Sequence, residues 1–269
     1  MIDVHCHLNF HAFEKDYDQV IQNAFDAGVT KIINVGTKLD SSQKAVELAQ
    51  KYENLYAIVG IHPHHADKLD KGWDKELVKL TKNAKKVVGI GECGLDYFSY
   101  KSNDIVDPKL QKEVFIKQIE LAYKLKLPLQ IHNRHAGKDI LDILINHKSY
   151  LLNPPGMFHC MSQDIDLLRK VLNLGFYVGF DGNITYKGLA QGETTTLKDL
   201  VKYAPLNRIV TETDSPFLTP EPKRGSRNIP FYVILVGKKV AEIKNVSFAK
   251  VRRQTIENAN AIFKLDAKH

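Results

Sequence analysis

The sequence of 269 residues contains only three cysteines, and none of them lies in a C-x-x-C arrangement. Three thiols cannot all form pairs, so a disulfide framework and a zinc-ribbon site are disfavoured. No apolar stretch approaches the length of a membrane span, and the start of the chain lacks the basic segment and apolar core of a signal peptide. We therefore expect a cytoplasmic protein that does not associate with membranes.

Low-complexity segments and internal repeats are also missing, which argues against disorder and against a repeat architecture. The composition, 43% hydrophobic and 26% charged, is ordinary for a folded enzyme. The length matches the roughly 250 residues typical of one α/β barrel. We expect residues 1–269 to form a single domain, and the sequence gives no sign of an obligate protein partner.

The chain carries a formal net charge of +7, which would suit a polyanionic substrate such as DNA. However, 31 of its 38 basic residues are lysines. Most of these lysines are scattered along expected helices, as on any solvated surface, so the charge alone does not separate a nucleic-acid site from an ordinary lysine-rich surface.

Short β-branched apolar runs alternate with amphipathic segments of helix length, of which residues 108–126 are the clearest. Strict alternation predicts a parallel sheet, and eight units predict closure into a (β/α)8 TIM barrel. A doubly wound open sheet needs a glycine-rich turn after its first strand, where His5, Cys6 and His7 stand instead. The eight expected strands are residues 2–5, 31–35, 56–61, 87–91, 129–132, 157–159, 176–180 and 209–213.

Imidazoles and carboxylates follow the carboxyl ends of five of these strands, on the rim where α/β barrels place their active sites. One strand-end histidine is a weak indication. Six such groups without a cation would repel one another or lack partners near the core, so together they predict a metal site. The expected ligands are His5, His7, Glu92, His132, His159 and Asp214.

Each cysteine directly adjoins one of these expected ligands in the sequence. Neighbouring residues on a strand point to opposite faces, so the thiols of Cys6, Cys93 and Cys160 should point away from the metal site. We therefore interpret them as packing residues. A thiolate-bound zinc site is the weaker alternative.

The chain resembles the TatD family of metal-dependent deoxyribonucleases, which belong to the amidohydrolase-like barrels. The resemblance covers nearly the whole sequence. It rests on "DVHCHL" at 3–8, "GIHPH" at 60–64, "GECGLDY" at 91–97, "QKEVFIKQIELAYKLKLPLQIH" at 111–132, "FHC" at 158–160, "ETDSPFLTP" at 212–220 and "RNIP" at 227–230.

The resemblance implies two divalent ions: His5, His7 and Asp214 would hold one, His132 and His159 the other, and Glu92 would bridge them. It implies catalytic roles for Glu92 as the bridge and for Asp214 as the general base toward the attacking water. Mg, Mn and Zn are the candidate metals, and histidine suits Mg least well.

The same resemblance places His62 and His64 toward the substrate, where they can contact phosphate, although histidines beside a proline can also simply cap a turn. Arg134 and Arg227 are further candidates for phosphate binding. The alternatives are a structural ion pair for Arg134 and an anchor for the last helix in the case of Arg227.

Aromatic residues cluster after the fourth strand, at Tyr97, Phe98 and Tyr100. These rings can stack on the bases of a single strand or pack against the neighbouring loop, and the sequence favours neither. Asp96 is expected to support a ligand or the loop, because Glu92 already supplies the bridging carboxylate.

The resulting hypothesis is a metal-dependent hydrolase that cleaves phosphodiester bonds at DNA ends, in single strands and from the 3′ end. One alternative is a related barrel hydrolase that cleaves another ester, such as D-aminoacyl-tRNA. A second is a barrel that binds nucleic acid without catalysis. The metal ligands cannot separate the two hydrolases, because the loops set substrate choice.

Overall fold

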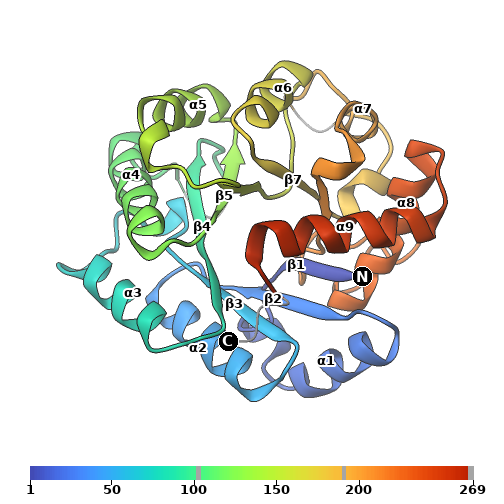
Figure 1. Ribbon diagram of the computed structural model, residues 1–269, viewed down its shortest axis with the longest axis horizontal. Helices are drawn as coiled ribbons and strands as arrows, with labels where there is room; N and C mark the ends of the chain where they lie inside the picture. Colours follow the sequence, from blue (N-terminus) through green and yellow to red (C-terminus); the bar gives the residue numbers. More distant parts are fainter. Residues whose placement is uncertain (101–103, 190–191, 266–269) are drawn as a thin grey trace.

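Eight parallel strands form one sheet in the order of the chain in a computed structural model of the protein, which describes residues 1–100, 104–189 and 192–265 (Figure 1). The expected (β/α)8 barrel is confirmed. The strands are β1 (Ile2–Cys6), β2 (Lys31–Val35), β3 (Leu55–Val59), β4 (Val87–Asp96), β5 (Leu129–Arg134), β6 (Gly156–Phe158), β7 (Tyr177–Phe180) and β8 (Ile209–Thr211).

The barrel closes between β1 and the segment that follows β8. Cys6 forms a parallel bridge with Ser215, and the Asp214 backbone N–H donates to the His5 carbonyl at 2.9 Å. The His7 N–H donates to the Ser215 carbonyl at 2.8 Å. The closing hydrogen bonds therefore join the two segments that carry expected ligands.

The helices surround the strands in Figure 1; one α-helix follows each strand from β1 to β7, and both α8 and α9 follow β8. Side-chain caps fix several starts: Asp107 accepts from the Lys109 N–H, Asp164 from the Leu167 N–H and Ser247 from the Lys250 N–H. The helices are α1 (Tyr17–Asp26), α2 (Leu39–Lys51), α3 (Trp73–Lys82), α4 (Pro108–Leu125), α5 (Gly137–Asn146), α6 (Ile165–Asn173), α7 (Leu197–Tyr203), α8 (Val233–Lys244) and α9 (Phe248–Phe263). In the described part of the chain, none is both long and apolar enough to cross a membrane.

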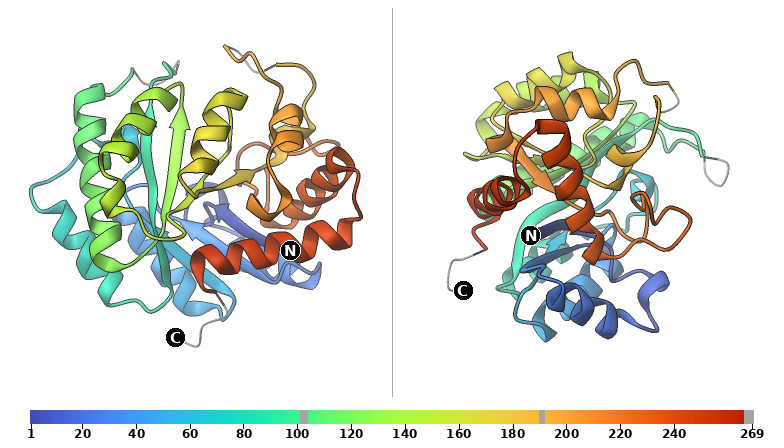
Figure 2. Two further views of the ribbon diagram at one scale, coloured as in Figure 1. Left: turned by 45° about the horizontal axis from the view of Figure 1, so that its top comes forward. Right: turned by 90° about the vertical axis from the view of Figure 1, so that its right-hand side faces the viewer.

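Helix α9 lies across one end of the barrel, as Figure 1 and the left view of Figure 2 show. Its Ile262 and Phe263 share a buried cluster with Ile2, Tyr56 and Val88, which stand at the starts of their strands. The amino-terminal rim is thus covered by apolar packing. The carboxyl-terminal rim is left for the polar residues.

Strand β4 is longer than expected, because it continues beyond Gly91 to Asp96. The register between β4 and β5 shifts between Ile90 and Cys93, and pairing then resumes up to Asp96 opposite Arg134. Gly94 permits this close pairing: its φ is 138°, and a Cβ there would lie 2.0 Å from the His132 carbonyl oxygen. Glu92 consequently lies within the strand, and Asp96 ends it.

Candidate metal centre

The six expected ligands lie together at the carboxyl-terminal rim, around the Glu92 carboxylate. Four of the six ligands have side chains that are at most 5% exposed, whereas the side chains of Asp214 and His132 are 13% and 14% exposed. These residues come from β1, β4 and β5 and from the segments directly after β1, β6 and β8. The barrel topology therefore assembles residues that are up to 209 positions apart.

The tautomers of His5 and His7 are fixed by their surroundings. His5 Nδ1 lies 2.8 Å from Gln130 Oε1, and the amide of Gln130 is oriented by its own donation to the Val4 carbonyl. His7 Nδ1 lies 2.9 Å from the Val35 carbonyl oxygen, which can only accept. In the neutral form of either ring, the proton is therefore on Nδ1 and the lone pair is on Nε2.

These two Nε2 atoms face each other at 3.1 Å. Glu92 Oε2 lies 3.7 Å from both, and Asp214 Oδ1 lies 3.6 Å from His5 Nε2 and 3.4 Å from His7 Nε2. Burial is the main reason why the pKa of His5 lies well below its ordinary value, and the nearby His159 lowers it further. The His5 ring therefore stays neutral. Four acceptors converge on one point, which is the arrangement that a cation satisfies.

The other oxygen of Glu92 faces a second group of histidines. Glu92 Oε1 lies 2.7 Å from His132 Nδ1, 3.7 Å from His159 Nε2 and 3.6 Å from His62 Nε2. Burial acts to raise the pKa of Glu92, but His62 and His132 outweigh it and hold the pKa well below its usual value. The carboxylate thus stays anionic between the two groups.

His132 contacts carboxylates through both ring nitrogens, because its Nε2 lies 3.1 Å from Asp96 Oδ2. Burial acts to lower the pKa of His132, but the hydrogen bonds to Asp96 and Glu92 raise it to about 9. His64 Nε2 also approaches Asp96 Oδ2, at 3.0 Å. Asp96 therefore supports two histidines, as the sequence indicated for it.

His62 has a different tautomer from His5 and His7. Its Nδ1 accepts from the His64 backbone N–H at 3.2 Å, which places the ring proton on Nε2, toward the centre. A donor at this position suits an anionic oxygen better than a metal ion. The structure thus brings His62 and His64 beside the ligands, where the expected phosphate contact stays a prediction.

Sequence reasoning missed Glu212, a fully buried carboxylate behind His159. Its Oε1 accepts from the Cys160 N–H at 2.6 Å and lies 3.2 Å from His159 Nδ1. Gly179 leaves room for it, since a Cβ there would lie 2.5 Å from Glu212 Oε1. The spacing of two residues before Asp214 could have indicated Glu212, as it did for His5 and His7.

The two arginines proposed as substrate contacts lie in different settings. The Arg134 guanidinium is exposed and lies over the rings of Phe98, at 4.6 Å, and Tyr100, at 5.4 Å, next to the centre. Arg227 donates to both carboxylate oxygens of Asp16, at 3.0 and 2.6 Å. Its side chain is already engaged in a structural pair, so substrate binding by Arg227 stays a prediction that this geometry does not favour.

The aromatic residues after β4 pack within their own loop region. Tyr97 donates to Asp139 at 2.8 Å, and Tyr100 donates to Asp96 at 3.1 Å. Phe98 and Tyr100 contact each other edge to face, at 4.8 Å between ring centres. Their packing accounts for their presence, with Arg134 covering both rings.

The three cysteines are free thiols and belong to none of the candidate metal clusters found among the described residues. Cys6 and Cys93 are fully buried in apolar clusters. Cys160 accepts from the Asn183 side-chain amide at 3.3 Å. This placement agrees with the packing role that strand alternation predicts.

The family profile described as "TatD related DNase" matches residues 2–264. The chain belongs to this family. It is 37% identical to "Uncharacterized metal-dependent hydrolase YabD" of Bacillus subtilis, over 99% of this chain and 100% of that one. Against "Uncharacterized metal-dependent hydrolase YcfH" of Escherichia coli K12 the identity is 32%, over 99% and 97% of the two chains.

The fold of this TatD-related chain is also similar to a solved structure from the same family. The crystal structure of YJJV, a TatD homologue from Escherichia coli K12, superposes with a TM-score of 0.89 at 28% identity. The superposition covers 98% of both chains. The family resemblance expected from the motifs is thus confirmed by both sequence and fold.

Proposed function

We propose that this protein is a divalent-metal-dependent hydrolase that cleaves phosphodiester bonds at the ends of single-stranded DNA. The observation that carries the proposal is the pair of Nε2 lone pairs on His5 and His7, 3.1 Å apart and flanked by Glu92 and Asp214. Without a cation, four acceptors, three of them buried, would face one another with no donor between them.

The donor set fits two ions. His5, His7 and Asp214 would hold one, His132 and His159 the other, and Glu92 would bridge them with its two oxygens, which already face the two groups. Imidazole and carboxylate together suit Mn or Zn better than Mg. When bound, divalent ions lower the pKa of water and offset the negative charge of a phosphodiester.

The protein's own groups would divide the remaining work. Asp214 has a side chain 13% exposed, so its carboxylate is open to a water molecule and can accept its proton. His62, with the ring proton on Nε2, would donate to a phosphate oxygen. Arg134 adds an exposed positive charge on the same rim.

Support for DNA as the substrate comes from the family description, since this chain matches "TatD related DNase" across residues 2–264. Support for hydrolysis comes from relatives named as metal-dependent hydrolases. A centre recessed at the mouth of a barrel favours a flexible strand end, because a rigid duplex presents its phosphates poorly there. We include cleavage from the 3′ end in the proposal.

An assay of the purified protein would test this function. The substrates would be single-stranded DNA labelled at either end, blunt duplex DNA and D-aminoacyl-tRNA, each with Mn²⁺, Zn²⁺ or Mg²⁺ and with chelator. We expect metal-dependent shortening of the single strand from its 3′ end and a lower rate on the duplex. Full activity in excess chelator would refute the metal dependence, and hydrolysis of the aminoacyl ester alone would replace DNA as the substrate.

A further inference from the structure

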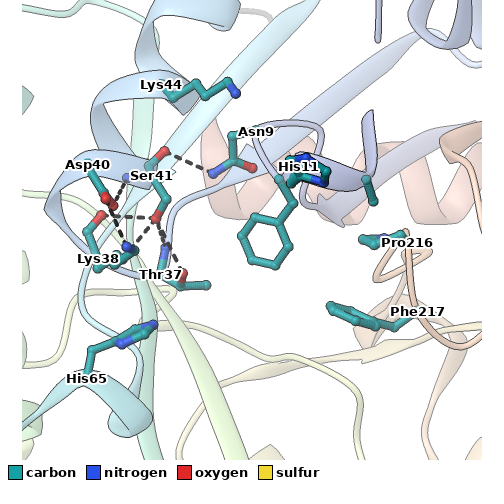
Figure 3. Close-up of a pocket in the computed structure, with 12 residues that line it drawn as sticks. Asn9, His11, Thr37, Lys38, Asp40, Ser41, Lys44, His65, Pro216 and Phe217 are labelled. Carbon is teal, nitrogen blue, oxygen red and sulfur yellow. Dashed lines mark hydrogen bonds and ion pairs between the residues drawn. The ribbon is translucent and has the colours of Figure 1, made fainter. Parts of the chain in front are cut away.

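A cavity of about 570 Å³ lies beside the candidate metal centre, and none of the six ligands lines it. Its walls come from the loop after β1, the start of α2, His65 after β3, and the loop after β8, as Figure 3 shows. Sites for small organic ligands commonly measure roughly 300–1,000 Å³. The volume therefore suffices for a ligand of the size of a nucleotide.

One wall of this cavity is shared with the metal centre. The Phe10 ring stacks on His7, with 4.4 Å between ring centres and 11° between planes. Phe217 lies 6.2 Å from Phe10 and 6.4 Å from His7, and its N–H donates to the Asp214 carbonyl at 2.8 Å. A group that rests on these rings would therefore be next to the reacting phosphate.

Phe217 is 51% exposed, although it is a large apolar side chain at the mouth of a polar site. Across the rim, the rings of Phe98 and Tyr100 are already covered by Arg134. The Phe217 face thus offers an aromatic surface that is open to a planar ligand. Base stacking on such rings tolerates any sequence, because every base has a π-face.

The opposite wall, on α2, is cationic. Lys38 pairs with Asp40 at 2.8 Å, whereas Lys44 forms no ion pair with any described residue. Burial is the main cause that lowers the pKa of His65, and the charge of Lys38 lowers it further. This imidazole therefore adds no charge at neutral pH. One positive charge is left uncompensated in the cavity, which matches one phosphate group.

The cavity wall is held in place by the protein itself. The Asn9 carboxamide donates to the Val35 carbonyl at 3.1 Å and to the Ser41 carbonyl at 2.9 Å, which ties the β1 loop to α2. The Ser41 hydroxyl accepts from the N–H groups of Thr37 and Lys38 at 2.8 and 3.0 Å. Such a wall needs little rearrangement when a ligand binds.

From these contacts we propose that the cavity is a nucleotide subsite. It would bind the nucleotide next to the scissile phosphate, with the base on Phe217 and Phe10 and the backbone phosphate beside Lys44. This inference rests on the proposed phosphodiesterase function and extends it, because it says which wall of the mouth holds the strand. The site would grip the base by stacking, so it would not select among the four bases.

Kinetics on a fluorescein-labelled octathymidylate, with Mn²⁺ supplied, would test the subsite. We expect Phe217→Ala to lower kcat/KM about tenfold, which is the loss of one base stack, and Phe217→Trp to keep most of it. Lys44→Gln should weaken binding and reduce the dependence of log K on log salt by about 0.7, the value for one phosphate of a single strand. Phe231→Ala and Lys250→Gln, which lie outside the cavity, are the matched controls.

Strands with one stable abasic residue would show whether the base itself is held. On the strand that lacks the base next to the cleaved bond, the effect of Phe217→Ala should largely disappear. The proposal would be overturned if Phe217→Ala lowered kcat/KM equally on abasic and intact strands, or if Phe217→Ala had wild-type kinetics on the intact strand.

Binding of the same labelled strand, measured by fluorescence anisotropy in chelator, separates this inference from the proposed function. If the wild-type protein binds the strand more tightly than Phe217→Ala but cleaves no DNA, the function is wrong and the subsite stands. If both proteins bind equally, or neither binds, the subsite is wrong whatever the activity.

Discussion

The two halves of the candidate centre are built differently. On one side of Glu92, His5 and His7 are 0% and 4% exposed, and the barrel fixes each ring through its Nδ1. On the other side, His132 and His64 are 14% and 24% exposed and contact Asp96. We call the side with His5, His7 and Asp214 the closed half. The side with His132, His159 and His64 is the open half, of which His159 is itself only 4% exposed.

The difference concerns protons as well as access. The closed half already presents lone pairs to a cation, because its Nδ1 atoms donate to fixed acceptors. In the open half, contacts with two carboxylates raise the pKa of His132 against the effect of burial, so a metal ion must displace a proton from this ring. We therefore expect the closed half to bind its ion more tightly and the open half to bind with a stronger dependence on pH.

Removing the shared ligand should have the largest effect, because Glu92 serves both halves. Glu92→Gln keeps the shape but removes the charge that offsets two neighbouring cations. We expect it to lower metal content to less than one ion per chain and to reduce turnover by about 10³-fold or more. Elemental analysis and steady-state kinetics measure both. A variant with two tightly bound ions would show that Glu92 is not the bridge.

Within the closed half, Asp214→Asn should separate metal binding from proton transfer. Asparagine keeps one ligand oxygen but cannot accept a proton at neutral pH. We expect normal folding, retention of much of the metal and a loss of at least about 10²-fold in the single-turnover rate. A near-normal rate would refute the role of Asp214 as the base, whatever its metal content.

The open half should give the metal-free protein a distinctive pH dependence. The raised pKa values of His132, about 9, and His159, about 10, mean that the folded state binds protons that the unfolded chain releases near 6.5. This stability is complete below pH 6.5 and is lost as pH rises through about 9 for His132 and about 10 for His159. The Met1 amine, whose pKa burial lowers from 8.0 to about 6, acts in the opposite direction but only up to pH 8.

We therefore expect the melting temperature of the metal-free protein to fall between pH 8 and pH 9. The stabilisation by added Mn²⁺ or Zn²⁺ should grow over the same range, since metal binding then displaces fewer protons. Differential scanning calorimetry in chelator and in excess metal measures both. His132→Gln is the control and should flatten the slope of the metal-free protein. A melting temperature that rises from pH 8 to pH 9 in chelator would contradict the assignment.

How much of this the sequence could predict depends on the range of the interactions. The strands and the ligands at their ends follow from local apolar runs and their polar neighbours, and the structure brings His5, His132 and Asp214 together as expected. Gln130 was missed because its contact with His5 arises only when distant strands meet. Glu212 had a local signal in its two-residue spacing from Asp214, but its contact with His159 also needed the fold.

The extent of β4 is a second case. The apolar run ends near Gly91, but pairing with β5 continues after an irregularity in register, which no local pattern indicates. Likewise the tautomer of His62 depends on a backbone N–H that folding places beside it. Features that depend on one specific contact needed the structure.

The smallest effects are expected at Arg134 and Arg227, which the sequence analysis proposed alike as phosphate contacts. Arg134 lies on the open half, exposed and without an ion pair to any described residue, whereas Arg227 pairs with Asp16 across 211 positions of the chain. Arg134→Gln should raise KM for single-stranded DNA by about tenfold with little change in kcat, and should reduce the salt dependence by about one phosphate contact. Arg227→Gln should leave kinetics unchanged and cost at most about 1 kcal/mol of stability, as for an exposed ion pair.

Asp16→Asn is the matched control, because it breaks the same pair from the other side and should reproduce the stability loss of Arg227→Gln. If Arg227→Gln instead raises KM while Asp16→Asn does not, Arg227 leaves its partner to bind substrate, and the strand contacts the rim beside the closed half as well.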